Sequence, residues 1–131
     1  MAGWESTVHL AAELASAGAA RRFVDGELRG HVPAPVLADL VLATSELVTN
    51  AIEHARTYPG VDVCVRVDAG RACVVVRSVG DHSGLAEAEL WATSPPDVPN
   101  GRGLGIVRNI ADDVSIERAG DVVEITVCRT L

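Results

Sequence analysis

Lysine is absent from this sequence of 131 residues, and all 11 basic residues are arginine. The absence of lysine excludes Schiff-base chemistry and the phosphate-binding loop that ends in Gly-Lys-Ser/Thr. The 18 acidic residues give a net charge of −7, so no broad basic surface can follow a nucleic-acid backbone. We therefore expect no direct binding to nucleic acid, and a phosphate site in this protein must use groups other than lysine.

Long apolar runs are also missing. No stretch approaches the roughly 20 continuous apolar residues of a membrane-spanning helix. The N-terminus MAGWESTVHL has neither the basic nor the apolar region of a signal peptide. A composition of 48% hydrophobic and 22% charged residues is typical of one globular domain, here residues 1–131. We expect a cytoplasmic protein that does not bind a membrane.

Cysteine and histidine are too few and too scattered to indicate a metal centre. Cys64, Cys73 and Cys128 have no CxxC spacing and stand in apolar, strand-like runs, which predicts buried reduced thiols. The 4 histidines show no ligand spacing, so we expect no zinc site.

Hydrophobic spacing predicts an early strand, two helices and then mainly strands. Helical periodicity covers Ala17 to Leu28 and, more strongly, Pro35 to about Arg56. The remaining predicted elements are strands around Val8 and over Val61–Val67, Ala72–Val79, Val114–Arg118 and Val122–Arg129, and a short helix over Leu104–Ala111. This order predicts an α+β fold, a two-layer α/β sandwich with helices on one face of a mixed, mainly antiparallel sheet.

The stretch between the two predicted hairpins is long and rich in proline and glycine. Loops of this size in compact domains are usually functional or mobile. We predict a mobile lid over Gly80–Asn100 that contains a short helix over Leu85–Ala92.

Two motifs carry the chemistry. Glu46, Asn50 and His54 follow one another at i, i+4 and i+8 on the polar side of the longer helix, where a solvated helix face is the alternative interpretation. Gly101-Arg-Gly103-Leu-Gly105 opens the later short helix, and backbone amides at such a helix start bind phosphate; a flexible start of the helix is the alternative. Together the motifs supply the parts of a Mg-nucleotide site without lysine.

These motifs resemble those of a known family. Glu46-Leu-Val-Thr-Asn50-Ala-Ile-Glu-His54-Ala is similar to the N box of the GHKL (Bergerat-fold) ATPases, and Gly101-Arg-Gly-Leu-Gly-Ile-Val-Arg-Asn-Ile-Ala-Asp112 is similar to their G2 box. Within that superfamily the chain most resembles the short anti-sigma-factor serine kinases of actinobacteria, from about Ala17 to Val127.

The resemblance implies a site for ATP and Mg²⁺. Asn50 would ligate the Mg²⁺, and Glu46 would be the catalytic base. His54 would line the phosphate end or else cap the last helical turn, and Arg102 would add a cation or else be an exposed loop residue. The implied nucleotide-binding set is Asn50, His54, Ser78, Gly80, Asp81, Gly101, Arg102, Gly103, Leu104 and Gly105.

The sequence departs from the family at the adenine end. Where the family has an aspartate that accepts a hydrogen bond from the adenine amino group, this chain has Ser78 in Ser78-Val79-Gly80-Asp81-His82. Loss of a charge-assisted partner costs about 1.5–3 kcal/mol, or roughly 10- to 150-fold in affinity. The family's threonine near the start of the last strand is also missing, since Asp121-Val122-Val123 follow Gly120.

Three functional hypotheses remain open. The first is an ATP-binding regulatory protein that phosphorylates a serine of an anti-sigma antagonist, sequesters a sigma factor, or does both. The second is a degenerate member that binds nucleotide weakly or not at all and acts only through protein partners, as Ser78 suggests. The third is a histidine-kinase catalytic domain, against which stands the lack of a histidine-bearing hairpin before Ala17. Whether the protein forms a homodimer is undecided by the sequence.

Overall fold

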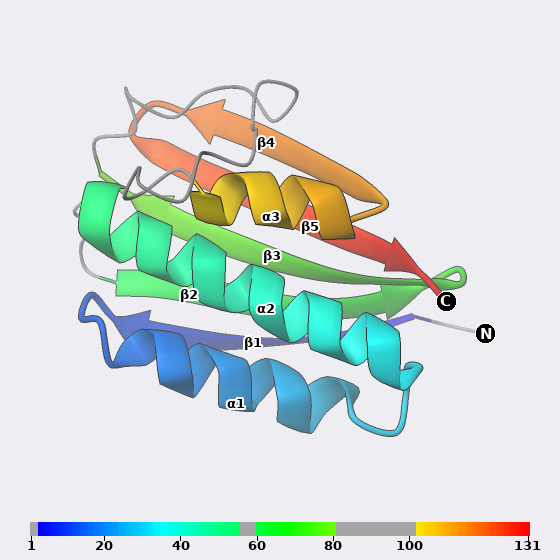
Figure 1. Cartoon of the computed structure of the whole chain (residues 1–131). Helices are drawn as coiled ribbons and strands as arrows, with labels where there is room; N and C mark the ends of the chain where they lie inside the picture. The colour runs from blue at the N-terminus through cyan, green and yellow to red at the C-terminus, as the bar shows by residue number, and fades with distance from the viewer. Residues whose placement is uncertain (1–2, 56–59, 81–101) are drawn as a thin grey trace.

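Three α-helices lie on one face of a five-stranded sheet in the computed structural model, which describes residues 3–55, 60–80 and 102–131 (Figure 1). The elements are β1 (Trp4–Ala11), α1 (Ser16–Leu28), α2 (Ala34–Asn50), β2 (Gly60–Asp68), β3 (Arg71–Val79), α3 (Arg102–Ile110), β4 (Asp113–Ala119) and β5 (Val122–Thr130). The predicted α+β sandwich is therefore confirmed. The predicted lid and the helix over Leu85–Ala92 lie outside the described residues, apart from Gly80 at the lid's first position.

The strands are ordered β1-β2-β3-β5-β4, and each of the four pairings between them is antiparallel. The sequence analysis expected a mixed sheet, but among the described strands no parallel strand pair is present. Short turns account for two of these pairings, β2 with β3 and β4 with β5, because they join strands that run in opposite directions. Between β2 and β3 the turn residues Ala69 and Gly70 have φ of 49° and 75°, as a two-residue hairpin turn requires.

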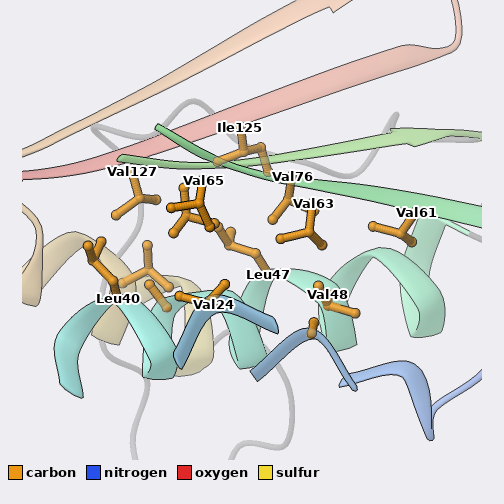
Figure 2. Packing of buried hydrophobic residues seen from close by; sticks show 14 of the residues in the cluster. Val24, Leu40, Leu47, Val48, Val61, Val63, Val65, Val76, Ile125 and Val127 are labelled. Atoms are coloured by element: carbon orange, nitrogen blue, oxygen red, sulfur yellow. The ribbon is translucent and has the colours of Figure 1, made fainter. Parts of the chain in front are cut away.

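The core lies between the helices and the sheet (Figure 2). Residues at alternate positions of each strand face the helices, and α2 presents one apolar stripe to them. Leu40 and Leu47 of α2 point toward the sheet in Figure 2, and Val48 belongs to the same buried cluster. They are buried in one cluster with strand residues that include Val61, Val63, Val65, Val76, Ile125 and Val127. This stripe fixes the rotation of α2 about its own axis.

The longer helix differs from the prediction at its C-terminal end. The α-helical form stops at Asn50, and Ala51–Ala55 form a π-helical turn instead of continuing as α-helix to Arg56. At the junction, the Ala51 N–H donates hydrogen bonds to the carbonyl oxygens of both Leu47 and Val48. Single π-turns within helices are frequent at functional sites. The apolar spacing of the sequence cannot distinguish this turn from regular α-helix.

Segment Ala34–Glu53 is long and apolar enough, by length and composition alone, to cross a membrane. In the fold Val36, Leu37, Leu40, Leu47 and Val48 of this segment belong to the core, and α2 packs between α1 and α3 over the sheet (Figure 1). Core helices of globular domains pass the same test, so the segment is interpreted as a core helix.

Two of the three cysteines form a disulfide, which the sequence analysis did not expect. Cys73 of β3 and Cys128 of β5 are direct register partners and are bonded to each other, whereas Cys64 is a free, half-buried thiol. The prediction of reduced thiols is wrong for this pair. The two cysteines are 55 residues apart, and only the register of β3 against β5 brings them together.

Leu47→Ala tests whether the α2 stripe holds the two layers together. Leu47 is 1% exposed, so we expect truncation to lower the free energy of unfolding by about 2–5 kcal/mol. Urea denaturation measures the change. Leu42→Ala on the same helix is the matched control, because Leu42 is 40% exposed and should change stability by no more than about 0.5 kcal/mol. Equal losses in both variants would contradict the orientation of α2.

Candidate functional site

The first turn of α3 contacts the polar side of α2. A Cβ atom added to Gly103 would overlap Oε2 of Glu46 and lie 3.1 Å from its Cδ. Only glycine therefore leaves room for the Glu46 carboxylate at this position. Because α3 begins beside Glu46, the structure brings together the two motifs that the sequence separates by about 50 residues.

The packing of α2 leaves Glu46 and Asn50 outside its buried stripe. Leu47 and Val48 are buried against the sheet, whereas the Glu46 and Asn50 side chains are half-buried. Among the described residues, no hydrogen bond or ion pair occupies the Glu46 carboxylate or the Asn50 carboxamide. The Glu46 carboxylate therefore stands beside the start of α3, and the Asn50 carboxamide lies one helical turn further along α2.

The N-terminus of α3 suits an anion. The first amide groups of a helix have no partner within the helix, and they carry the positive end of the helix dipole. The first turn of α3 contains no acidic residue of its own. Leu104 packs against the core, and Val107 is fully buried, so the helix is held to the rest of the fold by its apolar side. Leu104 thus offers the site only its backbone.

The end of β3 supplies a second polar position. Ser78 is 4% exposed and shares the helix-facing side of β3 with Val74 and Val76, which are both buried in the core. Gly80 follows at the end of the strand with φ of 154°, a conformation that favours glycine, and its amide donates to the Asp121 carbonyl oxygen at 2.8 Å. A buried hydroxyl and a glycine-dependent bend therefore mark this end of the sheet.

A comparison with protein-family models shows the family of this chain. A family model described as the histidine kinase-like ATPase domain matches residues 10–127. The chain belongs to this family.

A solved structure has the same fold as this histidine kinase-like ATPase domain. It is the crystal structure of the RsbU and RsbW domains of Rv1364c from Mycobacterium tuberculosis, with a TM-score of 0.71 and 19% sequence identity. The match covers 98% of this chain and 32% of that chain, so the chain spans about a third of its length. No curated protein matches the sequence.

Some of the expected site residues cannot be placed. Asp81 and Gly101 lie outside the described residues, and so do the side chains of His54 and Arg102. In residues 3–55, 60–80 and 102–131 no group of three or more His, Cys, Asp or Glu side chains could hold a metal ion.

The sequence analysis missed one group of charged residues in this domain. Arg129 on β5 forms ion pairs with both Asp39 on α2 and Asp112, which follows α3. Arg129 occurs at a helix-facing position of a strand, where an apolar residue would be expected from the alternation of Val123, Ile125 and Val127. This break in the alternation is the signal that could have identified it.

Gly103→Ala tests the contact between α2 and α3 without any ligand. In the wild type, the added methyl group would displace the Glu46 carboxylate, which offsets the gain in helix propensity of about 0.5–1 kcal/mol. In a Glu46→Ala background only Cβ remains, at 3.4 Å, and the gain should appear. We expect a coupling free energy of about 0.5 kcal/mol or more from urea denaturation of the four variants.

Gly26→Ala is the control for this cycle. Gly26 lies on α1, and a methyl group added to it would have no neighbouring atom within 4 Å, so its substitution should have the same effect with either residue at position 46. A Gly103→Ala effect that is equally independent of residue 46 would show that Glu46 and Gly103 are not in contact.

Proposed function

We propose that this domain binds ATP with Mg²⁺ at the junction of α2 and α3 and transfers the terminal phosphoryl group to a serine or threonine of a protein partner. The observation that carries the proposal is the contact between Glu46 and Gly103, which sets a carboxylate against the amide groups at the start of α3. The family match supports ATP as the ligand, because it describes a histidine kinase-like ATPase domain.

The residues present fit this ligand. The first amide groups of α3, which have no partner within the helix, would hold phosphate oxygens, as helix N-termini do in many nucleotide sites. The Asn50 carboxamide oxygen is a suitable ligand for Mg²⁺ and lies one turn from Glu46 on the same side of α2. When bound, ATP supplies the phosphoryl group and the charge that Mg²⁺ neutralises.

Glu46 is the residue that we assign to proton transfer. Its half-buried carboxylate is unpaired among the described residues, so it can accept the proton of an attacking serine or threonine hydroxyl. The contact with Gly103 holds this carboxylate beside the amide groups proposed to bind phosphate. Glu46 and α3 together would orient the hydroxyl and the phosphoryl group relative to one another.

Ser78 is assigned to the base of the nucleotide. Its buried hydroxyl can accept a hydrogen bond from the adenine amino group, but without the charge of the aspartate that the family resemblance places there. We therefore expect nucleotide affinity below that of relatives with aspartate at this position.

The proposed biological role is that of an anti-sigma-factor kinase. A structure that includes an RsbW domain shares the fold of nearly the whole chain, which supports an anti-sigma antagonist, a sigma factor or both as partners. The role would be carried out in the cytoplasm. The Cys73–Cys128 disulfide is the observation that argues against this location, since cytosolic proteins rarely keep disulfides.

A second candidate function is a domain that retains the fold and its partners but not the nucleotide. The buried, uncharged Ser78 favours it, because a neutral group at the adenine position weakens the recognition of the base. Such a protein would act by binding its partner alone.

Asn50→Ala and Glu46→Ala separate ligand binding from proton transfer. Isothermal titration with Mg-ATP should show a large loss of Mg²⁺-dependent affinity in Asn50→Ala, because the cation loses its oxygen ligand. Glu46→Ala should keep binding within a few-fold of wild type and lose phosphoryl transfer to a serine-containing partner by about 100-fold or more. Thr49→Ala, between the two positions on α2, is the control.

The titration also separates the two candidate functions. Binding by wild type and loss in Asn50→Ala agree with the proposed site, whereas equal binding by both contradicts it. No binding by wild type supports the domain that acts through protein contacts alone.

Ser78→Asp tests the adenine assignment. A carboxylate at this position should strengthen Mg-ATP binding by about tenfold or more, because it restores a charge-assisted hydrogen bond to the base. Ser78→Asn introduces a side chain of nearly the same size as aspartate but without its charge, so it should give no such gain. If the two variants bind Mg-ATP equally, Ser78 does not face the adenine amino group.

A further inference from the structure

Arg129 of β5 bridges α2 and the short segment between α3 and β4. Its guanidinium Nη1 donates a hydrogen bond to Oδ2 of Asp39 on α2, and its Nε donates to Oδ2 of Asp112 at 3.1 Å. The same Asp112 oxygen accepts the backbone N–H of Thr130 at 2.7 Å. The end of β5 is thereby bonded both to α2 and to the residue that leads from α3 into β4.

These ion pairs lie at the opposite end of α3 from Glu46. Gly103, at the start of α3, contacts Glu46, and Asp112 follows two residues after Ile110 at its end. Asp39 precedes Glu46 on α2 by seven residues, or about two helical turns. The two helices therefore run antiparallel (Figure 1) and are tied to each other near both ends of α3.

The helix α3 needs contacts with the rest of the fold to remain in place. It has nine residues, and isolated helices of this length are not stable in water. Gly103 and Gly105 have no side chains with which to anchor its first turns. Its position along α2 is therefore set by polar contacts at its end and by Leu104, Val107 and Ile110 in the core.

Burial distinguishes Arg129 from the exposed ion pairs of this protein. The Arg129 side chain is 21% exposed and is shared by two carboxylates, whereas Arg66 in its pair with Glu5 is 46% exposed. Exposed pairs contribute little to stability, while a partly buried guanidinium with two carboxylate partners fixes their geometry.

We propose that Arg129 is a positioning residue, which holds α3 in register along α2 through Asp39 and Asp112. In this register the amide groups at the start of α3 would hold the phosphate, and the Glu46 carboxylate would lie beside the hydroxyl that attacks it. The consequence for nucleotide rests on the proposed function. The restraint on α3 is a property of the protein without ligand, and the two can be tested separately.

Arg129→Gln and Arg66→Gln form the test and its control. Both remove one positive charge and one set of ion pairs, but Arg66 pairs with Glu5 between β1 and β2, away from α3. Hydrogen exchange of the ligand-free proteins should show α3 amides exchanging about tenfold faster or more in Arg129→Gln. Amides of β3 should be unchanged, and Arg66→Gln should match wild type in α3.

Titration with Mg-ATP tests the link to the site. We expect Arg129→Gln to raise the dissociation constant by about tenfold. Asp39→Asn should add little to that rise in the Arg129→Gln background, because both substitutions break the same interaction. Arg129→Lys has a single point charge that cannot hold both carboxylates in the same way, so its affinity should lie between those of wild type and Arg129→Gln.

The outcomes separate this proposal from the proposed function. Unchanged α3 exchange in Arg129→Gln overturns the proposal whatever the nucleotide result, and so does equal acceleration across α3 and β3, which indicates general destabilisation. Faster α3 exchange with unchanged Mg-ATP affinity also overturns it. If wild type binds no Mg-ATP, the proposed function fails, and selective acceleration of α3 exchange still supports the restraint by Arg129.

Discussion

The burial of the apolar stripe of α2 against the sheet is the constraint on which the other features depend. Leu40, Leu47 and Val48 occupy the centre of the core, between the strands and the neighbouring helices (Figure 2). A helix fixed in this way has a defined opposite side, and Glu46 and Asn50 lie outside the buried stripe. The hydrophobic packing therefore sets the direction of the polar groups to which we assign chemistry.

The second helix of the site is positioned differently. The helix α3 is short and glycine-rich, and Leu104, Val107 and Ile110 anchor its apolar side in the core, so its place depends on contacts with residues far away in the sequence. Gly103 admits the Glu46 carboxylate at one end, and Arg129 joins Asp39 and Asp112 at the other. The proposed phosphate site is thus formed by α2, which is fixed in the core, and by α3, which is held against it. Single substitutions can therefore test the position of α3 separately from that of α2.

Much of the fold could be predicted because its signals are local. The periodicity of α1 and α2, the alternation of β2 and β5 and the turn at Ala69–Gly70 each depend on neighbouring residues, and the predicted bounds agree with the structure within a few residues. The Glu46 and Gly103 motifs could also be recognised from spacing. Most wrong or missing predictions concern contacts between residues distant in sequence, namely the Cys73–Cys128 disulfide, the parallel strands expected in a mixed sheet and the ion pairs of Arg129. The π-helical turn Ala51–Ala55 is the local exception.

The sequence by itself determined which residue types can act here: with no lysine available, backbone amides, one carboxylate and one carboxamide remain for phosphate and Mg²⁺. Only the tertiary structure decided how they combine. Strand register and helix packing determine the contact of Glu46 with Gly103, the burial of Ser78 and the ion pairs of Arg129. Register and packing are set by contacts between residues that are distant in sequence. The types of these residues do not by themselves give the distances between them.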